Sequence, residues 1–284
     1  MEVRVAQHAG FCFGVESAVS RVMKLAETES APIYTYGPLI HNEQVEAELA
    51  EMGVGVIRSR EELQTLAGSG AIVVIRSHGV GEEVQREMQE LGLRVEDATC
   101  PFVKKIHRIV RQAEEEGRRP VILGSPDHPE VQGICGWCAD PTVVRNADEA
   151  ERLSLPADRP LTIVAQTTFP FRDFDNVVEI ICKKGYNVSV VNTICHATRE
   201  RQSEAESIAS SVERMIVIGG RNSSNTQKLF DICKKVCKQT VYIQTLSDLD
   251  LNKFRNVRSV GITAGASTPK KLIEEVHESV RNQS

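Results

Sequence analysis

The chain has no excess of basic residues and few aromatic ones. Its 284 residues include 34 Lys and Arg against 39 Asp and Glu, and aromatic side chains make up 5%. A nucleic-acid-binding surface needs a basic footprint, and single-strand binding also needs aromatic platforms on which bases stack. We therefore expect neither a nucleic acid nor an anionic membrane as a partner.

Targeting and nucleotide-binding signals are also missing. The N-terminal stretch MEVRVAQH carries charges and no apolar core, which argues against a signal peptide and a membrane span. A Walker-type glycine loop with its lysine is absent, so nucleotide binding is not indicated. These absences predict a cytoplasmic protein. In that compartment the eight cysteines are ligands, nucleophiles or packing residues, because thiols there stay reduced.

Short apolar runs alternate with amphipathic segments along the chain. Runs such as AIVVI, LTIVA and MIVIG are typical of buried parallel strands. Between such runs lie segments like KKLIEEVHESV, whose apolar residues share one face of a helix. Strict alternation of strand and helix predicts an α/β protein with parallel sheets.

Three cysteines divide the chain into similar units. Cys12, Cys100 and Cys195 each follow a strand-like run. A helix and a strand come next and end at a polar residue 28 to 30 positions after the cysteine, and a second helix and strand end at another polar residue. The first polar residues are His41, His128 and Asn225, and the second are His78, Thr167 and Ser267. This repeat predicts three small α/β units, 14–98, 99–193 and 1–13 with 194–284, arranged pseudo-threefold around a central cavity.

Three thiols that converge on one cavity suit two kinds of metal centre. A catalytic zinc takes three protein ligands and a water, whereas a 4Fe-4S cluster normally takes four cysteines. With three cysteines, one iron of a cluster keeps no protein ligand, and open coordination is typical of a catalytic site. Gly10 and Gly14 beside Cys12 favour the cluster, because they let the backbone pack against a bulky group.

Polar residues at the strand exits indicate what else the cavity binds. They are mostly neutral hydrogen-bonding groups near helix starts, where backbone amides also point outward, and such a set suits a phosphate or diphosphate. The set is His41, His78, Thr168, Ser223, Ser224, Asn225 and Ser267. In the stretch PDHPEV, Pro129 is typical of a first helical turn, so the carboxyl of Glu130 is expected at the cavity, where it can deliver protons.

The motifs that carry these residues resemble one known family. GFCFGV, LIHN, RSHGV, ATCP, DHPEV, QTT, TIC, NSSN and AGAST are similar, in this order and spacing, to the motifs of the LytB family of 4-hydroxy-3-methylbut-2-enyl diphosphate reductases. The resemblance implies one 4Fe-4S cluster held by Cys12, Cys100 and Cys195, with one iron lacking a protein ligand. It implies substrate binding by His41, His78, His128, Thr168, Ser223, Ser224, Asn225 and Ser267, and catalysis by Glu130, Thr167 and His128.

The resemblance also implies a reaction. The family reductively removes the hydroxyl of (E)-4-hydroxy-3-methylbut-2-enyl diphosphate, which gives isopentenyl and dimethylallyl diphosphates in the terminal step of the methylerythritol phosphate pathway. Ferredoxin or flavodoxin supplies the electrons, and we expect a cytoplasmic monomer. Two alternatives remain open at this point: a non-redox dehydratase that uses the same open iron, and a non-enzymatic iron-sulfur sensor.

Other cysteines and histidines receive structural interpretations. Cys135 and Cys138, in CGWC, lack both a second pair for zinc and the strand-to-helix context of a redox motif, so we interpret them as non-functional. Cys182, Cys233 and Cys237 are expected to pack. His107 lies in a charged helical segment and is expected to be solvated.

Overall fold

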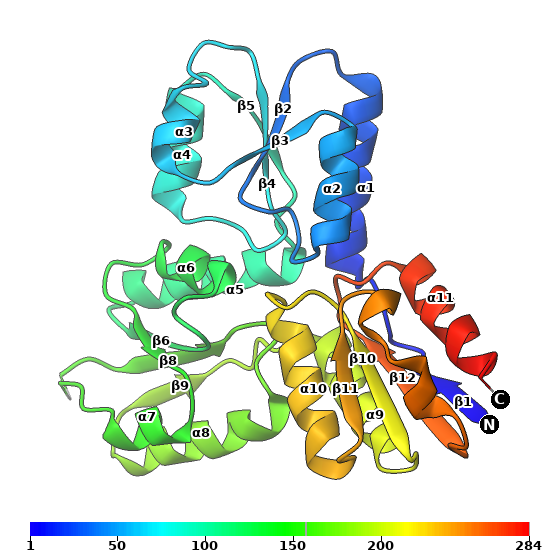
Figure 1. Ribbon diagram of the computed structural model, residues 1–284. Coiled ribbons are helices and arrows are strands. Elements are labelled where there is room, and N and C mark those ends of the chain that lie inside the picture. Colours follow the sequence, from blue (N-terminus) through cyan, green and yellow to red (C-terminus); the bar gives the residue numbers. More distant parts are fainter. Residues whose placement is uncertain (157, 284) are drawn as a thin grey trace. The chain divides into compact units, whose positions relative to one another are not determined.

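The computed structural model describes residues 1–156 and 158–283, and within them twelve strands form three four-stranded sheets (Figure 1). All strand pairs in these sheets are parallel. Parallel strands need crossover connections, which the intervening helices supply. The predicted α/β class with parallel sheets is therefore confirmed.

The three sheets are named here by their strands in spatial order. Sheet A consists of β1 (Glu2–Val5), β12 (Ser259–Ala264), β10 (Arg214–Ile218) and β11 (Thr240–Ile243). Sheet B consists of β3 (Val54–Ile57), β2 (Ile33–Tyr36), β4 (Ile72–Ile75) and β5 (Arg94–Asp97). Sheet C consists of β7 (Thr142–Val144), β6 (Arg119–Leu123), β8 (Leu161–Ala165) and β9 (Val188–Val190).

Helices connect the strands in chain order. The first six are α1 (Phe13–Thr28), α2 (Glu43–Glu51), α3 (Arg60–Gln64), α4 (Glu82–Glu90), α5 (Pro101–Glu115) and α6 (Pro129–Cys135). The next five are α7 (Ala147–Arg152), α8 (Phe171–Lys183), α9 (His196–Ala209), α10 (Ser224–Val236) and α11 (Lys270–Arg281). Two short 3-10 helices, η1 (Leu246–Asp248) and η2 (Leu251–Phe254), precede β12.

The chain forms two compact units. One comprises Met1–Glu16, Ile40–Glu48 and His196–Ser284 and contains sheet A. The other comprises Ser17–Leu39 and Leu49–Cys195 and contains sheets B and C. The domain boundaries at residues 98 and 193 stay a prediction.

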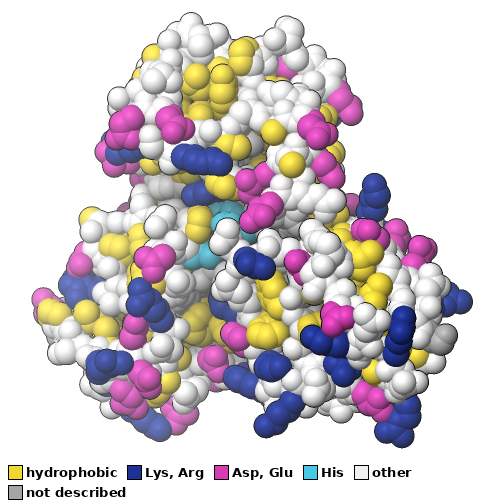
Figure 2. Space-filling model, viewed as in Figure 1, with side chains coloured by type: hydrophobic (Ala, Val, Ile, Leu, Met, Phe, Trp, Pro, Cys, Tyr) yellow, Lys and Arg dark blue, Asp and Glu magenta, His cyan; other side chains and the backbone are white. Residues whose placement is uncertain are grey.

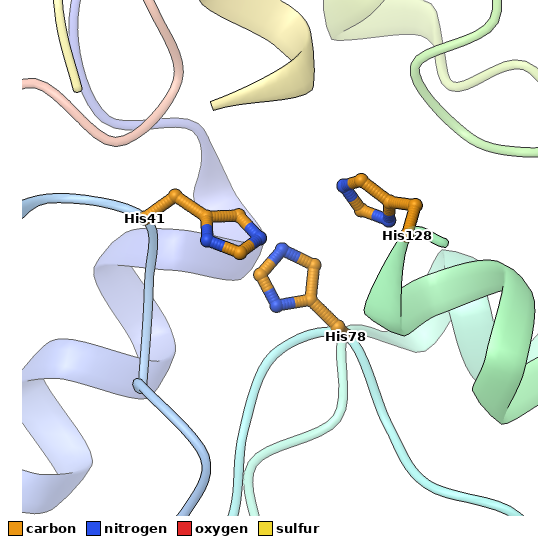
Figure 3. Close-up of side chains that lie close together, drawn as sticks. All are labelled: His41, His78 and His128. Atoms are coloured by element: carbon orange, nitrogen blue, oxygen red, sulfur yellow. The ribbon is translucent and has the colours of Figure 1, made fainter. Parts of the chain in front are cut away.

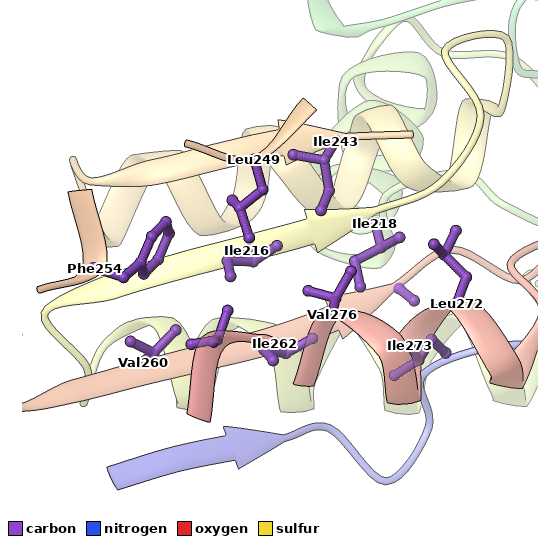
Figure 4. Close-up of a cluster of buried hydrophobic side chains, with 12 residues drawn as sticks. Ile216, Ile218, Ile243, Leu249, Phe254, Val260, Ile262, Leu272, Ile273 and Val276 are labelled. Carbon is purple, nitrogen blue, oxygen red and sulfur yellow. The ribbon is translucent and has the colours of Figure 1, made fainter. Parts of the chain in front are cut away.

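Alternating side chains bury both faces of sheet A. On β10, Ile216 and Ile218 pack in a cluster with residues of β12 and α11 (Figure 4). Met215 and Val217, which point to the opposite face, pack with residues of α9 and α10. Because side chains alternate along a strand, a strand covered by helices on both faces is apolar throughout. This is why runs such as MIVIG read as uninterrupted apolar segments.

Each sheet has one strand more than the repeat predicted. The additional strands, β3, β7 and β11, lie at an edge of their sheets. They have three or four residues and are only partly buried. The strands predicted at the opposite edges are equally short, but each precedes one of the three cysteines. The additional strands have no such neighbour, so the sequence pattern did not reveal them.

The surface carries charges of both signs. On the face drawn in Figure 2, acidic and basic side chains are interspersed, and neither sign forms a continuous field. Among the described residues, no helix combines the length and the apolar character that crossing a membrane requires.

Candidate active site

A β-turn of the same form follows one central strand in every sheet. The turns are Gly265–Thr268 after β12, Arg76–Gly79 after β4 and Gln166–Phe169 after β8. In each, the amide of the fourth residue donates to the carbonyl of the first, at 3.1, 3.0 and 2.9 Å respectively. Each sheet therefore presents the two central residues of a turn beyond its carboxyl end, where open parallel sheets bind ligands.

The three predicted ligand cysteines are each tied to one of these turns. The amides of Cys12, Cys100 and Cys195 donate to the carbonyls of the second turn residues, Ala266 (3.3 Å), Ser77 (3.0 Å) and Thr167 (3.1 Å). All three side chains are partly exposed, and each residue stands directly before a helix: α1, α5 or α9. The cysteines that the spacing placed in register thus occupy equivalent backbone positions.

The third residue of each turn carries a polar side chain at the carboxyl end of its sheet. These residues are Ser267, His78 and Thr168. The spacing of the repeats aligns Thr167 with Ser267 and His78, whereas the turn geometry shifts that alignment by one residue. Thr167 instead corresponds to Ser77 and Ala266, whose carbonyls receive the cysteine amides.

A glycine directly follows one central strand in every sheet. The amides of Gly37, Gly124 and Gly219, which directly follow β2, β6 and β10, donate to the last residue of the neighbouring edge strand at 2.7, 3.0 and 2.9 Å. Four positions after these glycines stand His41, His128 and Ser223. Ser223, rather than the predicted Asn225, is therefore the equivalent of the two histidines. The signal is present in the sequence as GPLIH, GSPDH and GGRNS, in which a glycine stands four positions before the polar residue.

In the unit that contains sheet A, polar groups gather around the Ser267 turn. The Ser267 hydroxyl donates to the carbonyl of His41 at 3.2 Å, and the Asn42 amide donates to the carbonyl of Ser267 at 2.8 Å. Ser223 caps α10, whose first residue is Ser224, by accepting a hydrogen bond from the amide of Thr226 at 3.3 Å. These contacts hold the His41 loop against the Ser267 turn.

The side chain of Asn225, in the same unit, is buried without a hydrogen-bond partner among the described residues. It lies in the first turn of α10 and is 5% exposed. Neither its amide nitrogen nor its carbonyl oxygen has a hydrogen-bond partner among the described residues. Burying an amide without partners is costly. A polar ligand at this helix N-terminus would supply the missing hydrogen bonds.

In the other unit, two histidines lie edge to face. His78, in the turn after β4, and His128, at the start of α6, have ring centroids 5.4 Å apart and an interplanar angle of 80° (Figure 3). Nδ1 of His128 accepts a hydrogen bond from the amide of Glu130 at 3.1 Å. This bond requires a neutral ring with its proton on Nε2, which makes Nε2 a hydrogen-bond donor.

Glu130 and Thr167 form a buried carboxyl–hydroxyl pair in the same unit. Glu130 is 2% exposed and lies in the first turn of α6 behind Pro129, as predicted. One carboxyl oxygen accepts the Thr167 amide at 2.6 Å, and the other accepts the Thr167 hydroxyl at 2.7 Å. Because the Thr167 carbonyl receives the amide of Cys195, the acid, the hydroxyl and a predicted ligand cysteine belong to one hydrogen-bonded group.

The thiols of the CGWC stretch are poorly suited to redox chemistry. Burial raises the pKa of Cys135, and burial with neighbouring negative groups raises the pKa of Cys138 to about 12. Both therefore remain protonated at neutral pH, whereas the thiolate is the nucleophile and the metal ligand. Their interpretation as non-functional residues agrees with this environment.

The predicted environments of Cys182 and His107 were wrong. Cys233 and Cys237 are buried as predicted, but Cys182 is exposed. His107, which was expected to be solvated, is 5% exposed and stacks on Trp137 with ring centroids 5.1 Å apart. Burial lowers the pKa of His107 to about 4. The charged residues around it in the sequence lie on other faces of α5, which is strongly amphipathic.

Comparisons with known proteins agree on one family. A family model described as LytB protein matches residues 3–281. The chain is 45% identical over 285 residues to the 4-hydroxy-3-methylbut-2-enyl diphosphate reductase of Alkaliphilus oremlandii, with 99% of this chain and 100% of that protein covered. It is 44% identical over 282 residues to the reductase of the same name from Geobacter sulfurreducens, with coverages of 99% and 97%.

Two solved structures are also similar. The E-1-hydroxy-2-methyl-but-2-enyl-4-diphosphate reductase of Plasmodium falciparum has a TM-score of 0.90 at 28% identity and is matched over 96% of this chain and 86% of its own. A structure described as (E)-4-hydroxy-3-methyl-but-2-enyl diphosphate reductase, the terminal enzyme of the non-mevalonate pathway, has a TM-score of 0.70 at 39% identity, with coverages of 99% and 100%.

Proposed function

Because this chain belongs to the LytB family, we propose that it reductively removes the hydroxyl group of (E)-4-hydroxy-3-methylbut-2-enyl diphosphate. Two electrons and two protons enter for each molecule of water released, and the products are isopentenyl and dimethylallyl diphosphates. The enzyme is an iron-sulfur oxidoreductase of the non-mevalonate isoprenoid pathway. The observation that carries this function is the buried Glu130–Thr167 pair, hydrogen-bonded to the backbone of Cys195.

The cysteines fit an iron-sulfur cluster. Thiolates are the usual protein ligands of such clusters, and Cys12, Cys100 and Cys195 are partly exposed at equivalent turns beyond the strand ends. Each stands at a helix N-terminus, whose partial positive charge favours an anionic group. When bound, a 4Fe-4S cluster held by these three cysteines supplies electrons and keeps one iron without a protein ligand.

The diphosphate-binding residues in this proposal are those that the family resemblance implies. Asn225, with its two unpaired amide atoms, gains hydrogen bonds when phosphate oxygens arrive. The Nε2–H of His128 is a donor for the same group. The other residues proposed to contact the diphosphate are His41, His78, Thr168, Ser223, Ser224 and Ser267. Their side chains are neutral donors or titratable imidazoles, which suit a polyanion.

Glu130 delivers a proton to the departing hydroxyl group. In its carboxylic-acid form it is a general acid, and the Thr167 hydroxyl, 2.7 Å from one of its oxygens, fixes its orientation. The near-complete burial of Glu130 excludes bulk water from the proton-transfer path, which protects a reactive allylic species from side reactions. His128, joined to the Glu130 amide through Nδ1, links the proton donor to the diphosphate site.

Three finer features complete the proposal. A small electron-transfer protein, ferredoxin or flavodoxin, supplies the electrons, as the family resemblance implies. The enzyme acts as a monomer, and its location is the cytoplasm. The resemblance and the composition support these features.

Anaerobic turnover with an artificial electron donor tests the function. The protein is reconstituted with iron and sulfide, reduced methyl viologen is added, and viologen oxidation is followed when the allylic substrate is supplied. We expect substrate-dependent oxidation of two viologens per product molecule. Substrate loss without viologen oxidation would instead establish a non-redox dehydratase. A loaded protein that neither reacts with the substrate nor binds inorganic diphosphate in calorimetry would establish an iron-sulfur sensor.

A further inference from the structure

The segment between β1 and Cys12 depends on a distant helix for part of its hydrogen bonding. Glu204, in α9, accepts the amide of Gln7 at 2.7 Å with one carboxyl oxygen and the amide of His8 at 2.9 Å with the other. These two amides lie just beyond the end of β1. A single carboxylate thus supplies the acceptors for both, and hydrogen bonds to a charged group are stronger than neutral ones.

Arg201, one helical turn before Glu204, binds the carbonyls of the same segment. Its Nε donates to the carbonyl of His8 and its Nη2 to the carbonyl of Gly10, both at 2.7 Å. Arg201 is 3% exposed, and its planar fork fixes the separation of the two carbonyls. Gly10 has a φ of +97° and therefore needs to be glycine. Arg201 and Glu204 together hold four backbone groups of residues 7–10.

The backbone before the other two predicted ligand cysteines is held by a nearby side chain instead of a distant one. Three positions before Cys100, the Asp97 carboxylate accepts the amide of Thr99 at 2.9 Å. Three positions before Cys195, the Asn192 side chain accepts the amide of Ile194 at 3.1 Å. Such Asx turns fix a backbone locally. At the equivalent position before Cys12 stands Ala9, which has no side-chain oxygen.

We propose that Arg201 and Glu204 are positioning residues that hold the Cys12 loop in its ligand-presenting conformation, in place of the Asx turn found before the other two cysteines. The inference rests on the proposed function, because it takes Cys12 to be a cluster ligand. Without the two side chains the loop samples more backbone conformations. Cys12 would then present its thiol to a bound cluster for less of the time, and iron would be lost faster.

The rate of iron release from the reconstituted protein to an anaerobic chelator tests this role. We expect Arg201→Met and Glu204→Gln to release iron about tenfold faster than the unsubstituted chain. Arg201→Met loses two charge-assisted hydrogen bonds, and Glu204→Gln loses one of the two acceptors together with the negative charge. Arg201→Lys, which keeps the charge but not the fork, should fall between. Circular dichroism of each variant confirms that it is folded.

Two matched controls separate this role from general stabilisation. Arg159 also donates to two carbonyls, those of Gly117 at 3.2 Å and Arg118 at 2.9 Å. Glu149 also accepts a backbone amide, that of Arg145 at 2.8 Å. Neither lies on a cysteine loop, so Arg159→Met and Glu149→Gln should keep the original release rate.

A rescue experiment completes the test. Adding Ala9→Asn to the Arg201→Met variant introduces the side-chain oxygen that the other two loops possess, and it should slow iron release again. Release from Arg201→Met, Glu204→Gln and Arg201→Lys at the original rate would overturn the positioning role while leaving the proposed function intact. Failure of the unsubstituted chain to bind iron and sulfide would overturn both.

Discussion

Two equivalent backbone positions beside sheets B and C carry side chains with different contacts. In sheet C, the sixth residue after the exit glycine is Glu130, and the second turn residue is Thr167; they are hydrogen-bonded and buried. In sheet B, the same positions hold Glu43, which is exposed, and Ser77, whose hydroxyl donates to the carbonyl of Leu39 at 3.3 Å. The backbone position alone therefore does not bury an acid. In sheet C the amide and hydroxyl of Thr167 hold the carboxyl of Glu130.

Sheet A shows a third use of these positions. Its sixth residue after the exit glycine is Asn225, and its second turn residue is Ala266, which has no hydroxyl. Asn225 is buried like Glu130, but it carries an amide in place of a carboxyl group and has no side-chain hydrogen-bond partner among the described residues. The matching places thus hold a hydrogen-bonded carboxyl in one sheet and an amide without partners among the described residues in another. The proposed function assigns proton delivery to the first and diphosphate binding to the second.

The largest effect is expected from removing the acid of sheet C. Glu130→Gln keeps the shape of the side chain but cannot act as an acid, so kcat should fall by about a thousandfold while iron and sulfide content stays unchanged. The equivalent substitution in sheet B, Glu43→Gln, is the control and should leave kcat unaltered. Viologen oxidation measures both, and full activity in Glu130→Gln would rule out the proton-delivery role.

The second-largest effect is expected from placing an acid in the first turn of α10, beside sheet A. Asn225→Asp puts a negative charge where the diphosphate is proposed to bind, so KM should rise by about a hundredfold, because unpaired like charges repel strongly when buried. Asn222→Asp makes the same change in charge at an exposed position of the same loop and serves as the control. An unchanged KM in Asn225→Asp would remove this residue from the binding site.

Removing the hydroxyl that orients the acid should have a smaller effect. Thr167→Val preserves shape but deletes the hydrogen bond to Glu130, and we expect kcat to fall about tenfold with Thr167→Ser restoring it. In sheet B, Ser77→Ala deletes only a long bond to a carbonyl and should change kcat little. Equal losses in the two variants would mean that the hydroxyls stabilise the turns without acting on the acid.

The smallest effect concerns the support of the sheet B turn by His107. A Cβ atom at Gly79, in that turn, would lie 2.7 Å from Cε1 of His107, so ring and turn are closely packed. Burial lowers the pKa of His107 to about 4. Between pH 6.5 and 4 the unfolded chain therefore binds more protons than the folded one, and stability falls as pH falls.

His107→Phe should remove this dependence. The ring can still stack on Trp137, and the loss of stability between pH 8 and pH 5 should shrink by about 2 kcal/mol. Urea unfolding at the two pH values measures the change. An unaltered pH dependence in the variant would show that His107 does not titrate in this range.

The sequence could predict the features that repeat or that are buried on both faces. Six strands were visible as apolar runs and three more as strand-like runs before the cysteines. The register of Cys12, Cys100 and Cys195 was visible as spacing. Edge strands such as β7, with three residues, lack such a run. The alignment of Thr167 with His78 was wrong by one residue, because the equivalence depends on turn hydrogen bonds rather than on residue type.

Long-range side-chain contacts could not be predicted from the sequence. Arg201 contacts the carbonyl of Gly10 across 191 positions, and nothing local to either residue signals that bond. The prediction for the environment of His107 was also wrong, since its stacking partner Trp137 lies in the turn after α6, distant in the sequence. Charged neighbours in sequence reveal little about a residue that faces the interior of an amphipathic helix.

The central claim is that three equivalent turns each provide one cysteine to a single cluster. The most direct measurement is the iron and sulfide content of anaerobically reconstituted Cys12→Ser, Cys100→Ser and Cys195→Ser, with Cys138→Ser and Cys182→Ser as controls. We predict that each of the first three loses most of its iron and sulfide, and that both controls keep the full content. Full content in any of the first three, or its loss in a control, would contradict the account.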